Sequence, residues 1–139
     1  MHSQRILIVD DEVQILERLS RLLGASGWRV VTALNGKDAL ERIKTSRPDA
    51  IVLDMLMPEM NGFQLARSLK SHPDYREIPI LAATSLSSRA DRARCLAAGC
   101  DAYVPKPFTV EQLHQWLSLL TRPQEDASRS HRGGPTTDD

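Results

Sequence analysis

The side chains in this sequence that are best suited to do chemistry are three acids, a hydroxyl and an amine. They are Asp10, Asp11, Asp54, Thr84 and Lys106. If three carboxylates come together, they repel one another, and one of them keeps its proton unless a cation lies nearby. A hard divalent cation with oxygen ligands, such as Mg²⁺, removes that repulsion. A carboxylate beside a metal and a lysine can attack phosphorus, so this set predicts the formation of an aspartyl phosphate.

Each of these residues stands at the end of a short apolar run that is typical of a β-strand. The runs are residues 5–9, 50–53, 78–83 and 102–104, and a further run, 28–33, carries no such residue. The first four are almost continuously apolar, as expected for strands covered on both faces. The run 28–33, "WRVVTA", has mixed polarity and suits the edge of a sheet.

Stretches with helical periodicity separate these runs. Helices are predicted from near Val13, over 36–44, from Asn61, over 88–99 and from Thr109. The side chains predicted to face inward are Ile15, Leu16, Leu19, Leu22, Leu23, Ala39, Leu40, Ile43, Phe63, Ala66, Leu69, Val110, Leu113, Leu117 and Leu120. Gly24 or Gly27 can end the first helix, and Gly99 can end the fourth. Thr109 and Gln112 resemble a capping box.

The alternation of these elements predicts the fold class. Five β–α units predict an α/β fold with a doubly wound parallel sheet, right-handed crossovers and helices on both faces. In such sheets, functional groups collect outside the carboxyl ends of the strands. The acids, the threonine and the lysine are therefore expected to meet at one edge of the sheet.

Length and charge limit the classes of function. The chain has 139 residues, 41% of them hydrophobic, which fits one globular domain. Basic and acidic residues number 18 each, and the resulting net charge of zero gives no electrostatic footprint for nucleic acid or an anionic membrane. No apolar run approaches the roughly 18 residues that span a bilayer. We therefore expect neither a nucleic-acid nor a membrane partner for this segment.

The two ends of the chain and its cysteines bear on location and domain boundaries. The N-terminal "MHSQRILIVDD" has no apolar leader, which argues for the cytoplasm. Cys95 and Cys100 match no C-x-x-C or zinc pattern, so two reduced thiols are expected. Residues 1–121 are predicted to form the domain. Residues 122–139 are rich in Pro, Gly, Ser and charge, and are predicted to be a disordered tail or a truncated linker.

The order of the polar residues resembles the response-regulator receiver domain of two-component signalling. Two acids follow the first strand, one acid the third, threonine the fourth and Lys-Pro the fifth. The loop "DMLMPEMNG" resembles the stretch after that family's phosphorylated aspartate, and "KPF" resembles its lysine loop. The likeness runs from residue 5 to about residue 120. It implies a flavodoxin-like fold with five helices and the strand order 2-1-3-4-5.

The resemblance assigns the acids to a phosphoacceptor and a metal site. Asp54 would be the phosphoacceptor and would also bind Mg²⁺. Asp11 would be a direct metal ligand, and Asp10 a ligand that acts largely through water. The backbone carbonyl of Leu56 would complete the protein's share of the metal sphere.

The resemblance also assigns three residues to the phosphoryl group and the switch. Lys106 would hold one phosphoryl oxygen, and Thr84 would be the switch hydroxyl that turns to another. Tyr103 occupies the place of an aromatic residue whose rotamer follows that threonine. The Lys106–Pro107 peptide bond is expected to be cis.

The implied function is a signalling switch that is enzymatic only toward itself. A histidine kinase or a histidine phosphotransfer protein would donate the phosphoryl group. Helix 88–99 would move, and its surface together with the next strand and helix would contact a downstream target protein. The alanines that leave this helix little buried anchorage are Ala90, Ala93, Ala97 and Ala98. Dimers through this face are common in relatives, so a phosphorylation-dependent homodimer is among the expected partners.

Two positions depart from the family's usual pattern. Leu56 places an apolar side chain where some relatives have amides or acids that orient water, so slow self-dephosphorylation is expected. Ser85 follows the switch threonine where the family prefers alanine or glycine, which bears on the access of the phosphoryl donor.

Taken one at a time, these residues have simpler structural interpretations. Asp10 or Asp11 could cap the following helix, and Thr84 could stand in the cap region of the fourth helix. Asp54 could be a turn residue and Lys106 a solvated surface lysine. The residues interpreted as packing side chains are Met55, Met57, Met60, Trp28, Trp116 and, as a half-buried strand aromatic, Tyr103.

Neighbouring α/β families have less support. A dinucleotide-binding fold requires G-x-G-x-x-G after the first strand, and a flavodoxin cradles phosphate with backbone amides there, whereas this chain has "VDDEVQ". Phosphatases of the haloacid dehalogenase type need a second acid where this chain has Leu56. Two functional alternatives stay open: a receiver-shaped interaction module that is not phosphorylated, and the receiver portion of a longer hybrid kinase or multidomain regulator.

Overall fold

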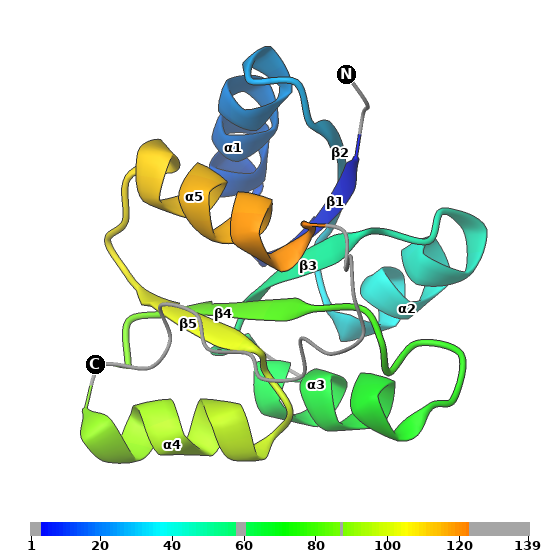
Figure 1. The fold of residues 1–139 in the computed structure, drawn as a ribbon, viewed down its shortest axis with the longest axis vertical. Coiled ribbons are helices and arrows are strands. Elements are labelled where there is room, and N and C mark those ends of the chain that lie inside the picture. Colours follow the sequence, from blue (N-terminus) through cyan, green and yellow to red (C-terminus); the bar gives the residue numbers. More distant parts are fainter. Residues whose placement is uncertain (1–3, 58–60, 87, 123–139) are drawn as a thin grey trace.

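A five-stranded parallel sheet with helices on both faces forms the described part of the chain (Figure 1). The computed structural model describes residues 4–57, 61–86 and 88–122. The strands are β1 (Arg5–Val9), β2 (Arg29–Ala33), β3 (Ala50–Asp54), β4 (Ile80–Thr84) and β5 (Ala102–Pro105). The helices are α1 (Val13–Ala25), α2 (Gly36–Thr45), α3 (Gly62–Ser71), α4 (Arg89–Ala97) and α5 (Val110–Leu120). Apart from Arg122, the predicted disordered tail lies outside the described residues.

The predicted fold class and strand order are confirmed. The strands lie in the order β2-β1-β3-β4-β5, and each neighbouring pair is parallel. β3 and β4 are buried along their whole length, because they lie inside the sheet with helices on both faces. β2 lies at an edge and is only partly buried, as its mixed polarity predicted.

The sheet separates two apolar cores. Successive side chains of a strand point to opposite faces. Ile6 and Ile8 therefore pack with side chains of α1 and α5, whereas Leu7 and Val9 pack with those of α2, α3 and α4. Figure 1 shows the same division, with α1 and α5 on one side of the sheet and the other three helices opposite. Packing on both faces fixes the strands, and hence the residues at their ends.

Most residues interpreted as packing side chains do lie in or against these cores. Met55 and Met57 belong to the core beneath α2, α3 and α4, and Trp28 and Trp116 border the other core. Met60 lies outside the described residues. The prediction that Leu22 faces inward is wrong, because its side chain is on the outer edge of the apolar stripe of α1 and is 37% exposed.

Reciprocal capping boxes fix the starts of three helices. Asn61, Ser88 and Thr109 each accept a hydrogen bond from the backbone N–H three residues on, and the side chain of that residue accepts one in return. The Thr109–Gln112 pair is the predicted capping box. The chain leaves α4 through Gly99, whose φ of 108° is strained for residues with a Cβ. None of the helices in the described ranges is both long and apolar enough to cross a membrane.

Candidate functional site

The three predicted acids meet at the carboxyl end of the sheet. Carboxylate oxygens of Asp10, Asp11 and Asp54 all lie within 4.8 Å of one another. β1 and β3 are neighbours in the sheet, so the acids that follow Val9 and Leu53 are brought side by side. Asp54 is itself the last residue of β3, because its backbone still pairs with β4, and the predicted strand was one residue too short.

Two of the acids are buried, and the third faces water. Asp10 is 4% exposed and Asp54 is 6% exposed, whereas Asp11 is exposed. The Asp10 backbone N–H donates to the carbonyl of Ala33, and its Oδ1 accepts from the N–H of Glu12 at 2.9 Å. Glu12 is the N-cap residue of α1 and makes no side-chain cap, so the interpretation of Asp10 or Asp11 as the cap is wrong.

Lys106 supplies the positive charge of the cluster. Its Nζ lies 3.2 Å from Asp10 Oδ2 and 3.7 Å from Asp54 Oδ2. Its backbone N–H donates to the carbonyl of Thr84, which holds the loop after β5 against the end of β4. The Lys106–Pro107 bond is cis, as predicted. Lys106 is therefore part of the acid cluster and not a solvated surface lysine.

The surroundings of Asp54 disfavour its ionised form. Burial raises the pKa of Asp54 from 3.8 to about 6; the N–H of Leu56 and the charge of Lys106 lower it, and Asp10 and Asp11 raise it. The Leu56 N–H donates to Asp54 Oδ1 at 3.1 Å. One lysine thus compensates the three carboxylates incompletely. An oxygen donor set of this kind, open to water beside Asp11, fits a hard divalent cation such as Mg²⁺.

Thr84 and Tyr103 are connected through the backbone of Leu86. Thr84 is fully buried as the last residue of β4, and its Oγ1 accepts from the Leu86 N–H at 3.0 Å. The Leu86 carbonyl in turn accepts a hydrogen bond from the half-buried Tyr103 hydroxyl. Ser88 is the N-cap of α4, so the interpretation of Thr84 as part of that cap is wrong. Thr84 and Tyr103 thus share Leu86 as a hydrogen-bonding partner.

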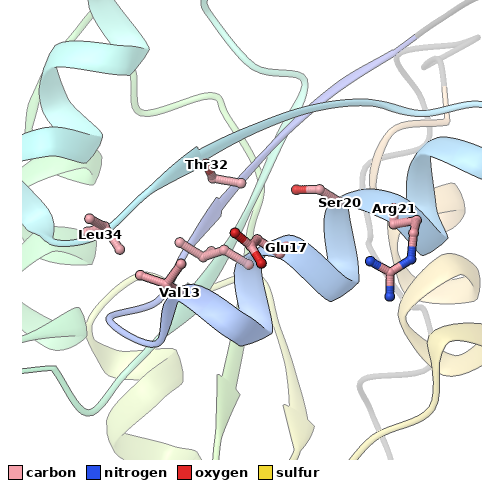
Figure 2. Close-up of a pocket in the computed structure, with 7 residues that line it drawn as sticks. Val13, Glu17, Ser20, Arg21, Thr32 and Leu34 are labelled. Atoms are coloured by element: carbon pink, nitrogen blue, oxygen red, sulfur yellow. The ribbon is translucent and has the colours of Figure 1, made fainter.

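Exposed apolar side chains lie just beyond the ends of β1, β2 and β3, on the first turn of α1 and on two loops. Val13 is 51% exposed, Leu34 42% and Leu56 47%. Val13 and Leu34 also line a cleft of about 550 Å³ between α1 and β2, where Glu17 and Arg21 are the charged residues (Figure 2). Asp10, Asp11, Asp54 and Lys106 do not line this cleft. The side chains suited to do chemistry therefore lie outside it. The role of the Leu56 carbonyl as a metal ligand stays a prediction.

Gly62 is a residue of the site that sequence reasoning missed. Its N–H donates to the Met55 carbonyl, and a Cβ at this position would lie 2.5 Å from Met55 Cα and 2.6 Å from the Asp54 carbonyl oxygen. The first turn of α3 therefore presses directly on the backbone that carries Asp54. The available signal was the "NG" pair after the Met-rich loop, but that pair fits an ordinary turn equally well.

A Gly62→Ala variant is expected to lose about 2–3 kcal/mol of unfolding free energy, because its methyl group would have to displace backbone atoms. Gly24→Ala is the matched control, since nothing lies within 4 Å of its new Cβ in α1. That control is expected to gain about 0.5–1 kcal/mol, because glycine is unfavourable inside a helix. Urea unfolding measures both differences. A Gly62→Ala variant as stable as the wild type would contradict this close approach.

Comparisons with known proteins agree with this geometry. Residues 6–118 match the family profile of the response regulator receiver domain. The response regulator MprA of Mycobacterium avium is 42% identical over 126 residues, which cover 88% of this chain and 54% of that protein. MprA of Mycobacterium tuberculosis is 42% identical over 130 residues, 92% of this chain and 56% of that protein. The chain therefore spans about half the length of the curated relatives it matches.

Solved structures lead to the same family. The chemotaxis protein CheY4 of Vibrio cholerae superposes with a TM-score of 0.81 at 31% identity, over 86% of this chain and 99% of that one. The BeF3-activated DrrB receiver domain superposes with a TM-score of 0.78 at 30% identity, over 88% of this chain and 100% of that one. With the acid cluster and Lys106 at the carboxyl edge of a 2-1-3-4-5 sheet, the chain belongs to the response regulator receiver domain family.

Proposed function

We propose that this chain is the phospho-accepting receiver of a two-component phosphorelay, with Asp54 as the acceptor. The observation that carries the proposal is the position of the Lys106 ammonium, 3.2 Å from Asp10 and 3.7 Å from Asp54, at a cluster of three carboxylates. A phosphoryl group brings about two further negative charges at neutral pH. A site that receives it needs cations around an acid able to act as nucleophile.

In this site, Asp10, Asp11, Asp54 and the backbone carbonyl of Leu56 would hold a Mg²⁺ ion. When bound, Mg²⁺ would neutralise negative charge on the phosphoryl oxygens and orient them. The exposed side of the cluster at Asp11 leaves room for water in the metal sphere, which Mg²⁺ usually retains. The cation would also favour the ionised form of Asp54, which its burial disfavours.

In the proposed transfer, a carboxylate oxygen of Asp54 attacks the phosphorus of a phosphohistidine on a histidine kinase or a histidine phosphotransfer protein. The new O–P bond forms as the N–P bond of the donor breaks, and the imidazole nitrogen keeps the electron pair. Lys106 donates a hydrogen bond to one phosphoryl oxygen, replacing part of its contact with Asp54. The same groups would promote slow hydrolysis. The chain is therefore proposed to catalyse only its own phosphorylation and dephosphorylation.

Thr84 is proposed to carry the switch. If its hydroxyl turns to a phosphoryl oxygen, the Leu86 N–H loses its present acceptor, and the loop before α4 can rearrange. Tyr103, which now donates to the Leu86 carbonyl, then loses or changes that contact. Such a change shifts the population of two arrangements of the α4, β5 and α5 surface. We propose that this surface binds the downstream target or a second phosphorylated copy.

We propose a cytoplasmic location, which the two free, buried cysteines of the described chain support, since thiols stay reduced there. Because the chain spans about half of its curated relatives, the output of the whole protein is also a matter of proposal. The chain can act alone or as the receiver portion of a longer regulator, and the roles of the site residues are the same in both cases.

The test is phosphorylation by acetyl phosphate, a small donor that needs no cognate kinase. With Mg²⁺ present, the intact protein is expected to gain the mass of one phosphoryl group, and fragmentation is expected to place it on the peptide that contains Asp54. Chelation of the metal with EDTA is expected to prevent the gain. No gain at saturating donor and Mg²⁺, in protein shown to be folded, would instead support the interaction module that is not phosphorylated.

A further inference from the structure

Helix α4 is held to the rest of the protein by unusually few apolar contacts. Of its nine residues, Cys95 alone is buried. Two arginines of α4 instead lie over aromatic rings on different elements. The guanidinium carbon of Arg92 is 5.7 Å from the centre of the Tyr103 ring on β5, and that of Arg94 is 4.2 Å from the centre of the Phe63 ring on α3. The two halves of the helix therefore rest on two different supports.

The support under Arg94 is fixed to the acid-bearing strand. Phe63 is 4% exposed and directly follows Gly62 in the first turn of α3. Gly62 contacts the Asp54–Met55 backbone so closely that it has no room for a Cβ. The Phe63 ring therefore belongs to a helix whose first turn packs directly against the backbone of Asp54 and Met55.

The end of α4 is fixed to α3 a second time. A Cβ at Gly99 would lie 2.5 Å from Cγ of Lys70, so the backbone after α4 lies directly against that side chain. The Lys70 ammonium donates to the carbonyls of Arg76 and Ile78 and to Oδ2 of Asp101. That carboxylate oxygen also accepts from the Ile80 N–H at 2.8 Å. Lys70 is thus held by several hydrogen bonds, and its side chain packs against the backbone at the C-terminal end of α4.

The N-terminal half of α4 contacts Tyr103, a residue that the proposed switch would move. Arg92 lies over Tyr103, whose hydroxyl donates to Leu86, whose N–H in turn donates to Thr84. These contacts connect Thr84 to the part of the helix that carries Arg92, whereas Arg94 contacts α3.

We propose that α4 moves by turning about its C-terminal half, with the contact of Arg94 on Phe63 as the hinge and Arg94 as a positioning residue. The cause of the turning rests on the proposed function; the hinge itself does not. Arginine–ring contacts at exposed sites shift a two-state equilibrium by about two- to fivefold. Arg94, whose side chain is 60% exposed, belongs to this class. Without the contact, the C-terminal half should open more often.

The first experiment measures amide hydrogen exchange along α4 by NMR, in the resting chain of 139 residues. In Arg94→Gln, the protection factors of the amides from Cys95 to Ala98 are expected to fall by about two- to fivefold. Arg89→Gln makes the same chemical change at an exposed position of α4 and is expected to leave them unchanged. Arg94→Lys keeps a cation and should restore part of the protection. Protection in Arg94→Gln equal to that in the wild type would overturn the hinge.

The second experiment adds Mg²⁺ and beryllium trifluoride, the species that activates the similar DrrB receiver domain. Binding is followed separately by ¹⁹F NMR, with Asp54→Asn as the negative control. On binding, the wild type is expected to lose protection from Asp91, the first amide of α4 with a hydrogen-bond acceptor, to Ala93, and to keep it from Arg94 to Ala98. Equal loss along the whole helix would overturn the hinge and leave the proposed function standing. If no analogue binds, the proposed function fails, while the resting-state comparison still decides on the hinge.

Discussion

An Asp54→Asn variant is expected to take up no phosphoryl group from acetyl phosphate and Mg²⁺ under conditions that label the wild type. The amide that replaces the carboxylate is not a nucleophile, and it keeps nearly the same shape beside Lys106 and Leu56. Asp49→Asn is a suitable control, because Asp49 precedes β3 at the opposite edge of the sheet and accepts from the Arg5 N–H. Intact-protein mass spectrometry checks both variants. Full labelling of Asp54→Asn would move the acceptor to another residue.

The same variant is expected to be more stable than the wild type in metal-free buffer at neutral pH. Burial raises the pKa of Asp54 to about 6 in the folded protein, against an ordinary aspartate value of 3.8. The folded state of the wild type therefore loses stability as the pH rises from about 4 to about 6, and the asparagine variant does not. The full shift corresponds to about 3 kcal/mol. We expect about 1–2 kcal/mol, because the cluster is open to water beside Asp11.

Urea unfolding at a series of pH values with EDTA measures this stability difference. It should grow between pH 4 and pH 6 and stay constant above pH 6. Added Mg²⁺ should reduce it, because the ion binds the wild-type carboxylates and stabilises their charged form. A difference that is independent of pH would show that Asp54 ionises in the folded protein as readily as in the unfolded chain.

A Lys106→Ala variant is expected to be phosphorylated by acetyl phosphate about 10²- to 10³-fold more slowly than the wild type, the usual cost of removing one preorganised donor to a developing charge. Its ammonium is the cation that lies against both buried acids among the described residues. The rate constant follows from the time course of labelling at saturating Mg²⁺.

Lys37→Ala is the matched control for Lys106→Ala, because Lys37 is an exposed lysine in the first turn of α2. That variant should react at the wild-type rate. If Lys106→Ala also reacts at that rate, then Lys106 stabilises the resting carboxylates and takes no part in the transfer. Circular dichroism of the variant shows whether its fold is retained.

The residues that sequence reasoning placed correctly are those whose position follows from the order of the strands. Asp10, Asp54 and Lys106 come together because each lies at, or directly after, the carboxyl end of a parallel strand, and these ends share one edge of the sheet. Local rules likewise located the capping box at Thr109, and the mixed polarity of β2 placed that strand at an edge. Such features depend on a few neighbouring residues or on a repeating pattern.

Contacts between distant segments could not be foreseen in this way. The approach of Gly62 to the Asp54 backbone depends on the path of a whole loop and on the angle at which α3 packs. The contact of Arg94 with Phe63 joins two helices that have no periodic relation in sequence. The outward position of Leu22 failed for a similar reason: a helical repeat gives the direction of an apolar stripe, but the width that becomes covered depends on the neighbouring elements.

The burial of Cys95, on the inner face of α4, provides a natural reporter for that helix. Its sulfur is fully covered, and burial raises the pKa of its thiol, so an alkylating reagent finds almost no thiolate to attack in the closed protein. The thiol becomes reactive when the helix lifts from the sheet. The rate of Cys95 alkylation therefore measures how often the helix opens, and the measurement requires no mutation or partner protein.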